Sequence, residues 1–510
     1  MKKFLFIGLI FSMLTGCSFS LDFNGGMLNS SVNEHKPQTS MSVIEGSAEK
    51  EGLKGIDYLK YYSDLTNCKV LPSLGEQNIL VVPVLFKDDN INDLPYQSSK
   101  IFDDLDKAFN GSELDTGWES VNSYYQKSSY GKLDIKSTIV KEWIRLDKTF
   151  NEIARLSSDT YYDPTWYVVD NVVNELASSP TYNLKDYDND QDGYIDGIWL
   201  IYGRNSYLNI EDRNPTKAEE EILWAYTFWE YNNSSSVDNP KANVYCWGSY
   251  DFMYGSKNTP MTLDAHTFIH ETGHMLGLDD YYDYDDTANP SGCLDMMDYN
   301  IGDHNAYTKY LLGWVEPIVY DYVPSNFTLK PFEESGECIL IPASNERSVS
   351  VMEEYLLIEY YTPTGLNEHD SKYKYLNYYP KMFTKNGIKI YHIDSRIGAL
   401  FNTGSDWVAK SYAYNFTKDD LYSNTTKFAY FAIMASNTPS YSYVNNFKLL
   451  SLISNYYGPE YMYRDNYAQN RDLFTDGSKL ESFKFNSSQR VDLNIKVTSI
   501  NDIHAKISIG

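Results

Sequence analysis

A chain of 510 residues is too long for one ordinary hydrophobic core, so two or three domains are expected. The formal net charge of −27 gives a surface that repels polyanions, which argues against binding to DNA or RNA. Aromatic residues make up 15 % of the chain and 47 residues are tyrosine, which favours β-rich structure over disorder.

The first residues have the pattern of an export signal. A short basic start is followed by an apolar run, residues 4–13, that is too short to span a bilayer. The run leads to Leu14-Thr15-Gly16-Cys17, which resembles the lipobox of bacterial lipoproteins. The resemblance implies that residues 1–16 are a signal peptide and that a lipid on Cys17 anchors the protein outside the membrane. The alternative is a plain secretory signal in which Cys17 is incidental.

The next segments alternate in predicted type. Residues 17–75 are polar, so we expect a tether, with a pro-segment as a further role. Buried strands are predicted at residues 79–86 and 195–202, the first with Pro83 as a sign of an edge or bulge. Helices are predicted at residues 103–109, 120–128 and 164–176. The alternation predicts an α/β or α+β domain over residues 76–320, and we assign the chain to the α+β class.

After residue 320 short strands separated by Gly, Pro, Asn and Ser predominate, at residues 337–342, 355–361, 387–393, 428–435 and 491–509. This pattern predicts a β-rich, sandwich-like domain over residues 321–510. Four cysteines follow Cys17, namely Cys68, Cys246, Cys293 and Cys338. They can form two disulfides or remain as buried thiols, and the absence of a CxxC pair argues against a cysteine zinc site.

Residues 270–274 carry the pattern HExxH, with His270, Glu271 and His274. Residues four apart lie on one face of a helix, so the two imidazoles can hold one metal ion. Glu271 is next to a ligand, where its carboxylate can reach a metal-bound water and take its proton. We therefore predict a zinc site with Glu271 as general base. Thr259 as N-cap and Pro260 as first helical residue predict where the helix begins.

The pattern continues to Gly277 and Asp280. Gly277 can adopt the left-handed conformation that ends a helix, and the returning chain brings a residue three positions later towards the metal. Asp280 is therefore the predicted third ligand. Alternatively Asp280 orients a ligand histidine or caps the turn, and Asp279, Asp283 or a more distant acid is the ligand. His266 lies one helical turn before His270, and we interpret it as structural.

Residues 270–284 (HETGHMLGLDDYYDY) resemble the immune inhibitor A family of secreted bacterial metallopeptidases. Further segments fit that family in the same order: residues 128–133 (SSYGKL), 188–202 (DNDQDGYIDGIWLIY), 293–299 (CLDMMDY), 305–314 (NAYTKYLLGW), 353–359 and 387–394. The resemblance covers roughly residues 76–395. It implies a zinc endopeptidase with a zincin-type catalytic domain and attached β-domains.

Residues after the predicted helix suggest the rest of a catalytic site. Met296 or Met297 is a candidate apolar floor beneath the zinc, with ordinary core packing as the alternative. Tyr299 and His304 are candidates to stabilise the oxyanion of a tetrahedral intermediate. The alternative for both is a hydrogen-bonded role in the core.

A second metal site is suggested by Asp188, Asp190, Asp192 and Asp196, which surround a glycine at position 193. Alternate acids imitate the start of an EF-hand, but position twelve is Trp199, which cannot supply a carboxylate. We therefore expect a shorter calcium-binding loop that stabilises the fold. The alternative is a solvated acidic turn.

The leading hypothesis is thus an extracytoplasmic, lipid-anchored zinc metalloendopeptidase of the bacterial cell envelope that acts on proteins or peptides. One alternative is a zinc amidase that hydrolyses another amide, because water activation would use the same residues. A second is an inactive surface binding protein, against which the intact Glu271 argues. No feature of the sequence indicates an oligomer, so we expect a monomer.

Overall fold

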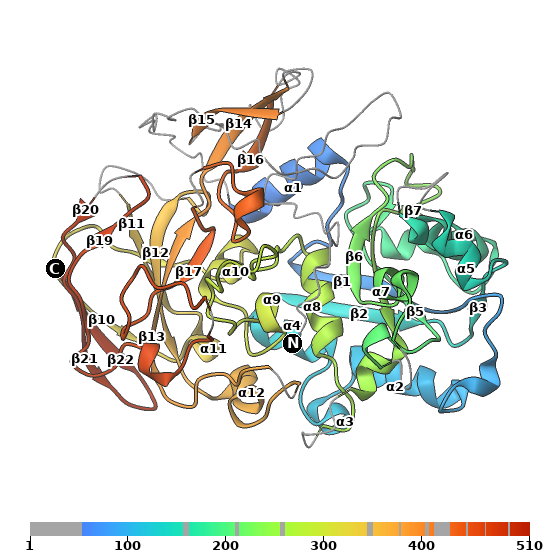
Figure 1. Ribbon diagram of the computed structural model, residues 1–510, viewed down its shortest axis with the longest axis horizontal. Coiled ribbons are helices and arrows are strands. Elements are labelled where there is room, and N and C mark those ends of the chain that lie inside the picture. The colour runs from blue at the N-terminus through green and yellow to red at the C-terminus, as the bar shows by residue number, and fades with distance from the viewer. Residues whose placement is uncertain are drawn as a thin grey trace. The chain divides into compact units, whose positions relative to one another are not determined.

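The structure is a computed structural model that describes residues 54–156, 163–209, 214–255, 261–343, 350–376, 379–402, 407–412, 429–444, 447–464, 466–487 and 490–510 (Figure 1). The chain forms two compact units, one of residues 62–277 and one of residues 278–510 together with the described residues 54–61. The division precedes residue 320, where the sequence places the end of the first domain. Helices and several separate sheets are present, as expected for an α+β protein.

The first unit is built on one sheet with strand order β2–β1–β5–β8–β6. The first four strands are parallel, and β6 joins β8 antiparallel at the edge. Parallel strands covered on both faces are expected to be apolar throughout, and β5 and β8 are entirely buried. The strands are β1 (Gly75–Leu85), β2 (Leu133–Ile139), β3 (Ile144–Arg145), β5 (Ile198–Tyr202), β6 (Tyr226–Trp229) and β8 (Val244–Ser249).

The expectation that Pro83 marks an edge or a bulge is wrong, because β1 lies between two neighbours in the sheet. Proline cannot donate a backbone hydrogen bond, so it is normally excluded from such a strand. Here β2 pairs with β1 only as far as Val81, and β3 pairs with it from Val84 onward. Pro83 therefore lies where the neighbouring strand is interrupted, and no ladder bond is lost on that side.

Helices of the first unit begin where the sequence offers caps. Ser120 accepts a hydrogen bond from the Ser123 N–H before α4, and Asp163 accepts one from the Thr165 N–H before α6. Buried residues of α6 contribute to one core with strands β1, β5 and β8. The helices are α2 (Ser98–Asn110), α3 (Glu113–Thr116), α4 (Val121–Ser128), α5 (Phe150–Ala154), α6 (Pro164–Ser178), α7 (Lys217–Ile222) and α8 (His266–Met275).

The second unit is rich in β-structure. One sheet has the order β17–β13–β12–β11–β9, another has the order β10–β22–β21–β18, and residues of both contribute to a single core. The strands are β9 (Ile318–Val319), β10 (Ser325–Leu329), β11 (Cys338–Pro342), β12 (Glu354–Tyr361), β13 (Gly387–Asp394), β17 (Leu450–Leu452), β18 (Lys479–Leu480), β21 (Ile495–Ile500) and β22 (Ala505–Ile509). The predicted strands at residues 337–342, 355–361 and 387–393 are confirmed as β11, β12 and β13.

Shorter elements complete the second unit. A separate sheet of β14 (Ile397–Asn402), β15 (Trp407–Tyr412) and β16 (Ala429–Ile433) follows β13. The helices after residue 278 are α9 (Met296–Tyr299), α10 (Ala306–Leu311), α11 (Phe332–Ser335) and α12 (Glu368–Lys372). Within the segment expected to be a tether, the structure forms helix α1 (Gly55–Thr66).

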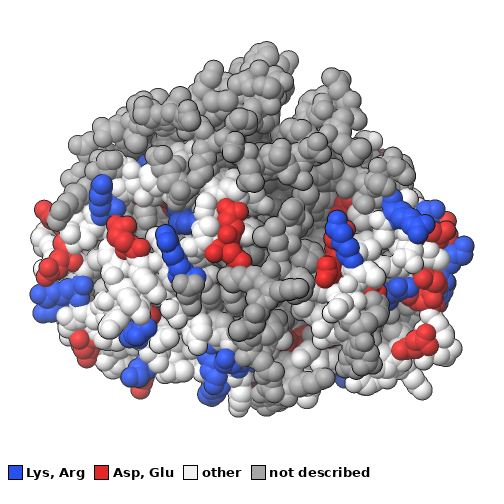
Figure 2. Space-filling view, viewed as in Figure 1, with Lys and Arg blue, Asp and Glu red and all other residues white. Residues whose placement is uncertain are grey.

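Cys68, Cys246, Cys293 and Cys338 are buried free thiols, so no disulfide forms among them. Burial raises the pKa of the Cys68 thiol to about 12, which keeps it protonated and unreactive at neutral pH. In the part of the chain that the structure describes, no helix is long and apolar enough to cross a membrane. On the face seen in Figure 2, acidic and basic side chains are interspersed. Cys17 and the signal peptide lie outside the described residues.

Candidate metal centre

Helix α8 is fixed from both sides by residues of the first unit. Trp199 of β5 donates its indole N–H to Thr272 Oγ1 at 3.1 Å, and the Tyr125 hydroxyl of α4 donates to the Ile269 carbonyl at 2.7 Å. The Phe268 ring stacks on that of Phe109 with centroids 5.0 Å apart. Buried hydrogen bonds and ring packing leave the helix little freedom to rotate, so the face that it presents is set.

The predicted helix start at Pro260 is wrong. Helix α8 begins at His266, and the described residues 261–265 before it are not helical. Asp264 accepts a hydrogen bond from the His266 N–H at 3.0 Å, so an acid two residues before the helix satisfies one of its first donors. Thr259 and Pro260 themselves lie outside the described residues.

His270 and His274 lie on one face of α8, as their spacing predicts. Their ring centroids are 4.9 Å apart and the ring planes are nearly perpendicular, at 85°. Each side chain is buried. Two imidazoles at this separation can direct one nitrogen each to a common point, which is the arrangement that a shared metal ion requires.

The chain turns directly after the helix, and the turn brings a carboxylate to the histidines. The Gly277 N–H donates to the His274 carbonyl at 2.9 Å, and Gly277 has φ +87°, in the left-handed region that favours glycine. Along this continuous stretch of chain, one ligand atom each of His270, His274 and Asp280 lies within 4.8 Å of the others. The three residues are called the HHD group below.

Neighbouring residues distinguish Asp280 from its competitors. The Tyr284 hydroxyl donates a hydrogen bond to Asp280 Oδ2. Burial raises the pKa of Tyr284 well above its usual value, and the Asp280 charge raises it further, so the phenol keeps its proton. Asp283 is engaged elsewhere, because its Oδ2 accepts the N–H groups of Thr287 and Ala288, both at 3.1 Å. Asp279 is buried and does not belong to the HHD group.

Glu271 is held by the edge strand of the sheet. Thr227 of β6 places its Oγ1 3.0 Å from Glu271 Oε2 and 2.9 Å from the Glu271 carbonyl oxygen. Cys246 of β8 packs beside them, with its Sγ 3.3 Å from that carbonyl. The carboxylate therefore has a hydroxyl that fixes its orientation. Sequence reasoning missed Thr227 because it precedes Glu271 by 44 residues and stands in an unremarkable strand.

His266 contacts two residues of its own unit. Its Nδ1 lies 2.8 Å from Asp264 Oδ1, and its ring stacks on that of Trp118 with centroids 4.0 Å apart. The side chain is fully buried and does not belong to the HHD group. These two contacts fit the structural role that the sequence suggests, which stays a prediction.

The methionine segment forms helix α9. Met296 and Met297 are completely buried, and the Met297 carbonyl accepts a hydrogen bond from the Tyr281 N–H at 2.7 Å. Asp295 caps the helix by accepting the Met297 N–H at 2.9 Å. Burial raises the pKa of Asp295 to about 6 and that of Asp298 to about 7. The methionine segment therefore packs against the turn that carries Asp280. Its environment is buried and contains the carboxyl groups of Asp295 and Asp298.

The two oxyanion candidates lie in the second unit, and neither belongs to the HHD group. Tyr299 is half-buried at the end of α9, with its ring 4.8 Å from that of Tyr379. Desolvation raises the pKa of Tyr299, so it can act as a donor. His304 is 1 % exposed and lines a small cavity of about 10 Å³ together with Asp303, Glu359 and Lys389.

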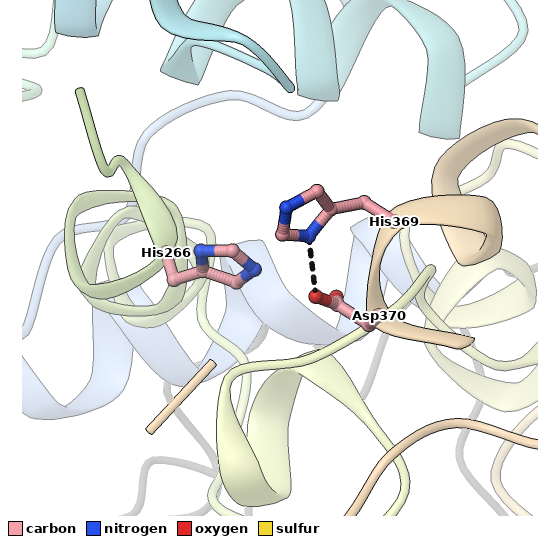
Figure 3. Close-up of side chains that lie close together, drawn as sticks. All are labelled: His266, His369 and Asp370. Atoms are coloured by element: carbon pink, nitrogen blue, oxygen red, sulfur yellow. Dashed lines mark hydrogen bonds and ion pairs between the residues drawn. The ribbon is translucent and has the colours of Figure 1, made fainter. Parts of the chain in front are cut away.

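One histidine–acid pair was missed by sequence reasoning. His369 Nδ1 lies 3.0 Å from Asp370 Oδ1 in α12 (Figure 3). Asp370 Oδ2 also accepts the Gly302 N–H at 2.7 Å, so the acid ties α12 to the loop after α9. His266, which Figure 3 also draws, belongs to the other unit. Nothing in the local sequence separates this adjacent pair from ordinary helix residues.

The acidic loop before β5 gathers three of its four aspartates. One carboxylate oxygen each of Asp188, Asp190 and Asp196 lies within 4.8 Å of the others. Asp192 is not in this group, because its Oδ2 forms an ion pair with Lys69 at 2.9 Å. Trp199, at the twelfth position, is buried in β5. The three aspartates are called the calcium loop below, after the ion that the sequence predicts for them.

Two features of the calcium loop suit it to bind a cation. Asp188 is 5 % exposed, and its Oδ1 has no hydrogen-bond partner among the described residues. Desolvation, followed by the charge of Asp190, raises the pKa of Asp196 well above its usual value. A hard cation bound by oxygen ligands would remove both penalties, because it satisfies the lone pairs and offsets the like charges.

No family model matches the chain, and no curated protein matches it.

Proposed function

We propose that the protein is a zinc metalloendopeptidase with a zincin-like catalytic domain over residues 76–320. The observation that carries the proposal is the HHD group, two buried imidazole nitrogens and a carboxylate oxygen within 4.8 Å of one another, adjacent in the chain to Glu271. Two histidines and one carboxylate are a donor set that catalytic zinc sites use, with a further position left for water or substrate.

The chemistry follows from the residues around that donor set. Zinc, when bound, supplies a Lewis acid that polarises the substrate carbonyl and lowers the pKa of water to about 7. Glu271 accepts the proton of the attacking water and passes it to the leaving nitrogen. Thr227 holds one oxygen of the Glu271 carboxylate, so that the carboxylate stays oriented during both transfers. Tyr284 holds the Asp280 carboxylate by donating its phenolic proton.

A peptide is the favoured substrate because residues 270–284, and further segments in the same order, resemble secreted bacterial metallopeptidases. Water activation by Glu271 would serve another amide equally, so the preference for peptides rests on this resemblance.

The experiment is cleavage of unfolded casein by the purified protein from residue 18 onward. We expect cleavage that a metal chelator stops and that zinc restores. Glu271→Ala should retain zinc and lose at least about a hundredfold in rate, the size of a general-base contribution. Glu175→Ala, an exposed glutamate of α6, is the matched control and should cleave normally. Zinc binding without casein cleavage by the wild type would favour the amidase, and absence of zinc would favour the binding protein.

We also propose that the calcium loop holds one calcium ion that stabilises the first unit. At a calcium concentration about a hundred times Kd, binding contributes about 2.7 kcal/mol, or a rise of several degrees in Tm. Asp196→Asn should abolish this rise in a thermal melt. Asp192→Asn, which removes the partner of Lys69 outside the group, should keep it. Equal responses of the two variants to calcium would contradict the assignment.

A further inference from the structure

The second unit contains an open groove that the zinc site does not use. Its volume is about 400 Å³, within the range of about 300–1,000 Å³ usual for small-molecule sites. Two segments of chain supply most of its lining, before β13 and before β18. The lining residues are Lys374, Lys381, Met382, Phe383, Thr384, Tyr467, Ala468, Gln469, Asn470 and Arg471.

Hydrogen bonds between the two segments preform the groove. Asn470 Oδ1 accepts the Thr384 N–H at 2.8 Å, and Asn470 Nδ2 donates to Thr384 Oγ1 at 2.8 Å. Asp472, which is buried, accepts the Gln469 N–H at 2.8 Å and the Ser454 hydroxyl at 2.5 Å. Both walls are therefore tied to each other and to the body of the unit, so a ligand need not order them.

The groove is cationic in a strongly acidic protein. Lys374, Lys381 and Arg471 line it, and none of the described lining residues is an acid, although the chain carries a net charge of −27. Three cations without a lining acid create a local positive potential that attracts anions and repels the acidic surfaces found elsewhere on the same protein. The charge of the groove thus points to an anionic ligand.

Arg471 is held in place by two neighbouring tyrosine rings. Its guanidinium carbon lies 4.8 Å from the centroid of the Tyr456 ring and 4.9 Å from that of Tyr457. Its Nη2 donates to the Tyr457 hydroxyl at 2.6 Å, and the Tyr457 ring stacks on that of Tyr461 at 4.0 Å. A guanidinium fixed in this way presents its N–H donors in a fixed planar arrangement, which suits bidentate binding of a carboxylate or sulfate.

Exposed tyrosines lie beside Arg471 and in the lining of the groove. Tyr456 and Tyr457, which contact Arg471, are 63 % and 42 % exposed, and Tyr467, which lines the groove, is 44 % exposed. The flat face of the Tyr467 ring can pack against the C–H face of a sugar ring, while Thr384 and Gln469 offer hydrogen-bonding groups for hydroxyls. Aromatic faces, amides and fixed cations together match a sugar that carries acidic groups.

We propose that this groove binds an anionic oligosaccharide, one whose sugar rings carry carboxylate or sulfate groups. Arg471 and Lys381 contact the acidic groups, and Tyr467 contacts a sugar face. An acidic peptide would satisfy the cations equally, but it offers no flat apolar face for the exposed Tyr467 ring. The inference goes beyond the proposed protease activity and does not rest on it, because every residue involved belongs to the second unit.

The test is calorimetric titration of the purified protein at low salt with a heparin tetrasaccharide, neutral maltotetraose and hexaglutamate. We expect the heparin tetrasaccharide to bind, the other two to bind at least tenfold more weakly, and added salt to weaken binding. Arg471→Ala should weaken binding at least tenfold. Arg471→Lys keeps the charge but loses the planar pair of N–H donors, so its affinity should lie between those of the wild type and Arg471→Ala. Tyr457→Ala should also weaken binding.

Lys506→Ala is the matched control, since Lys506 is an exposed cation of β22 in the same unit and does not line the groove. It should bind as the wild type does, and unchanged thermal melts should show that all variants fold. Absence of binding by the heparin tetrasaccharide would overturn the proposal. Equal binding of hexaglutamate or of maltotetraose, or an Arg471→Ala variant that binds normally, would overturn it as well.

Discussion

Thr227 and Tyr284 each hold a carboxylate of the candidate site, and both were beyond the reach of sequence reasoning. Thr227 contacts Glu271 across a strand-to-helix interface, and Tyr284 donates to Asp280 from the loop that follows it. His270, Glu271 and His274 could be predicted, because a fixed helical spacing links them within five residues. The contact between Thr227 and Glu271 joins segments 44 residues apart, and the contact between Tyr284 and Asp280 depends on how a loop folds. Neither contact follows from a helical spacing.

We expect Thr227→Val to lower kcat/KM about tenfold, because a hydrogen bond to a charged group contributes about 1.5–3 kcal/mol. Zinc content should not change, since Thr227 does not belong to the HHD group. Steady-state cleavage of a peptide measures the effect. Thr227→Ser keeps the hydroxyl and serves as the control. In a Glu271→Gln background the same substitution should cost little more, and a full additional loss would contradict a role through Glu271.

At the scale of elements, local sequence patterns predicted the presence of strands and helices more reliably than the residues at which they begin and end. Helix α6 follows the predicted Pro164 start because Asp163 and Pro164 are strong local signals. Helix α8 begins six residues later than predicted, at His266, whose N–H donates to Asp264 Oδ1. The expectation of an edge or a bulge at Pro83 was wrong because the interruption between β2 and β3 is a property of the sheet, which the local sequence does not show.

The turn at Gly277 is the element on which Asp280 depends. A side chain at φ +87° is strained, so Gly277→Ala should lower the free energy of unfolding by about 1 kcal/mol. We also expect weaker zinc binding, measured by competition with a chelator, because the strained turn displaces Asp280. Gly131→Ala is the matched control, with φ +75° and open space at the added Cβ, in the same unit. It should lose similar stability and bind zinc normally. Unchanged zinc affinity of Gly277→Ala would contradict the role of the turn.

At the scale of the whole molecule, the sequence correctly indicated more than one core and a mixed α+β composition. Each unit has a core of its own, one around the parallel sheet and one between the two larger sheets of the second unit. The division at Gly277 could not be predicted, because it falls inside a continuous motif. The groove beside Arg471 could not be predicted from the sequence either, because its two walls are about ninety residues apart along the chain.

A lipid on Cys17 is the membrane attachment that we predict from the sequence, and a net charge of −27 opposes direct binding to anionic headgroups. We expect the full chain, expressed in bacteria, to partition into the detergent phase of Triton X-114. Cys17→Ser should move to the aqueous phase, and Ser20→Ala should behave as the wild type does. Detergent-phase partitioning of Cys17→Ser would contradict lipidation at this residue.

The most direct test of the central claim is the zinc content of the purified protein, measured by mass spectrometry after dialysis. The HHD group predicts about one zinc ion per chain in the wild type and in Glu271→Gln, and almost none in His270→Ala or His274→Ala. Asp280→Ala should bind zinc more weakly than the wild type. A wild-type chain without zinc, or full zinc content in both histidine variants, would show that these residues do not form the metal centre of this protein.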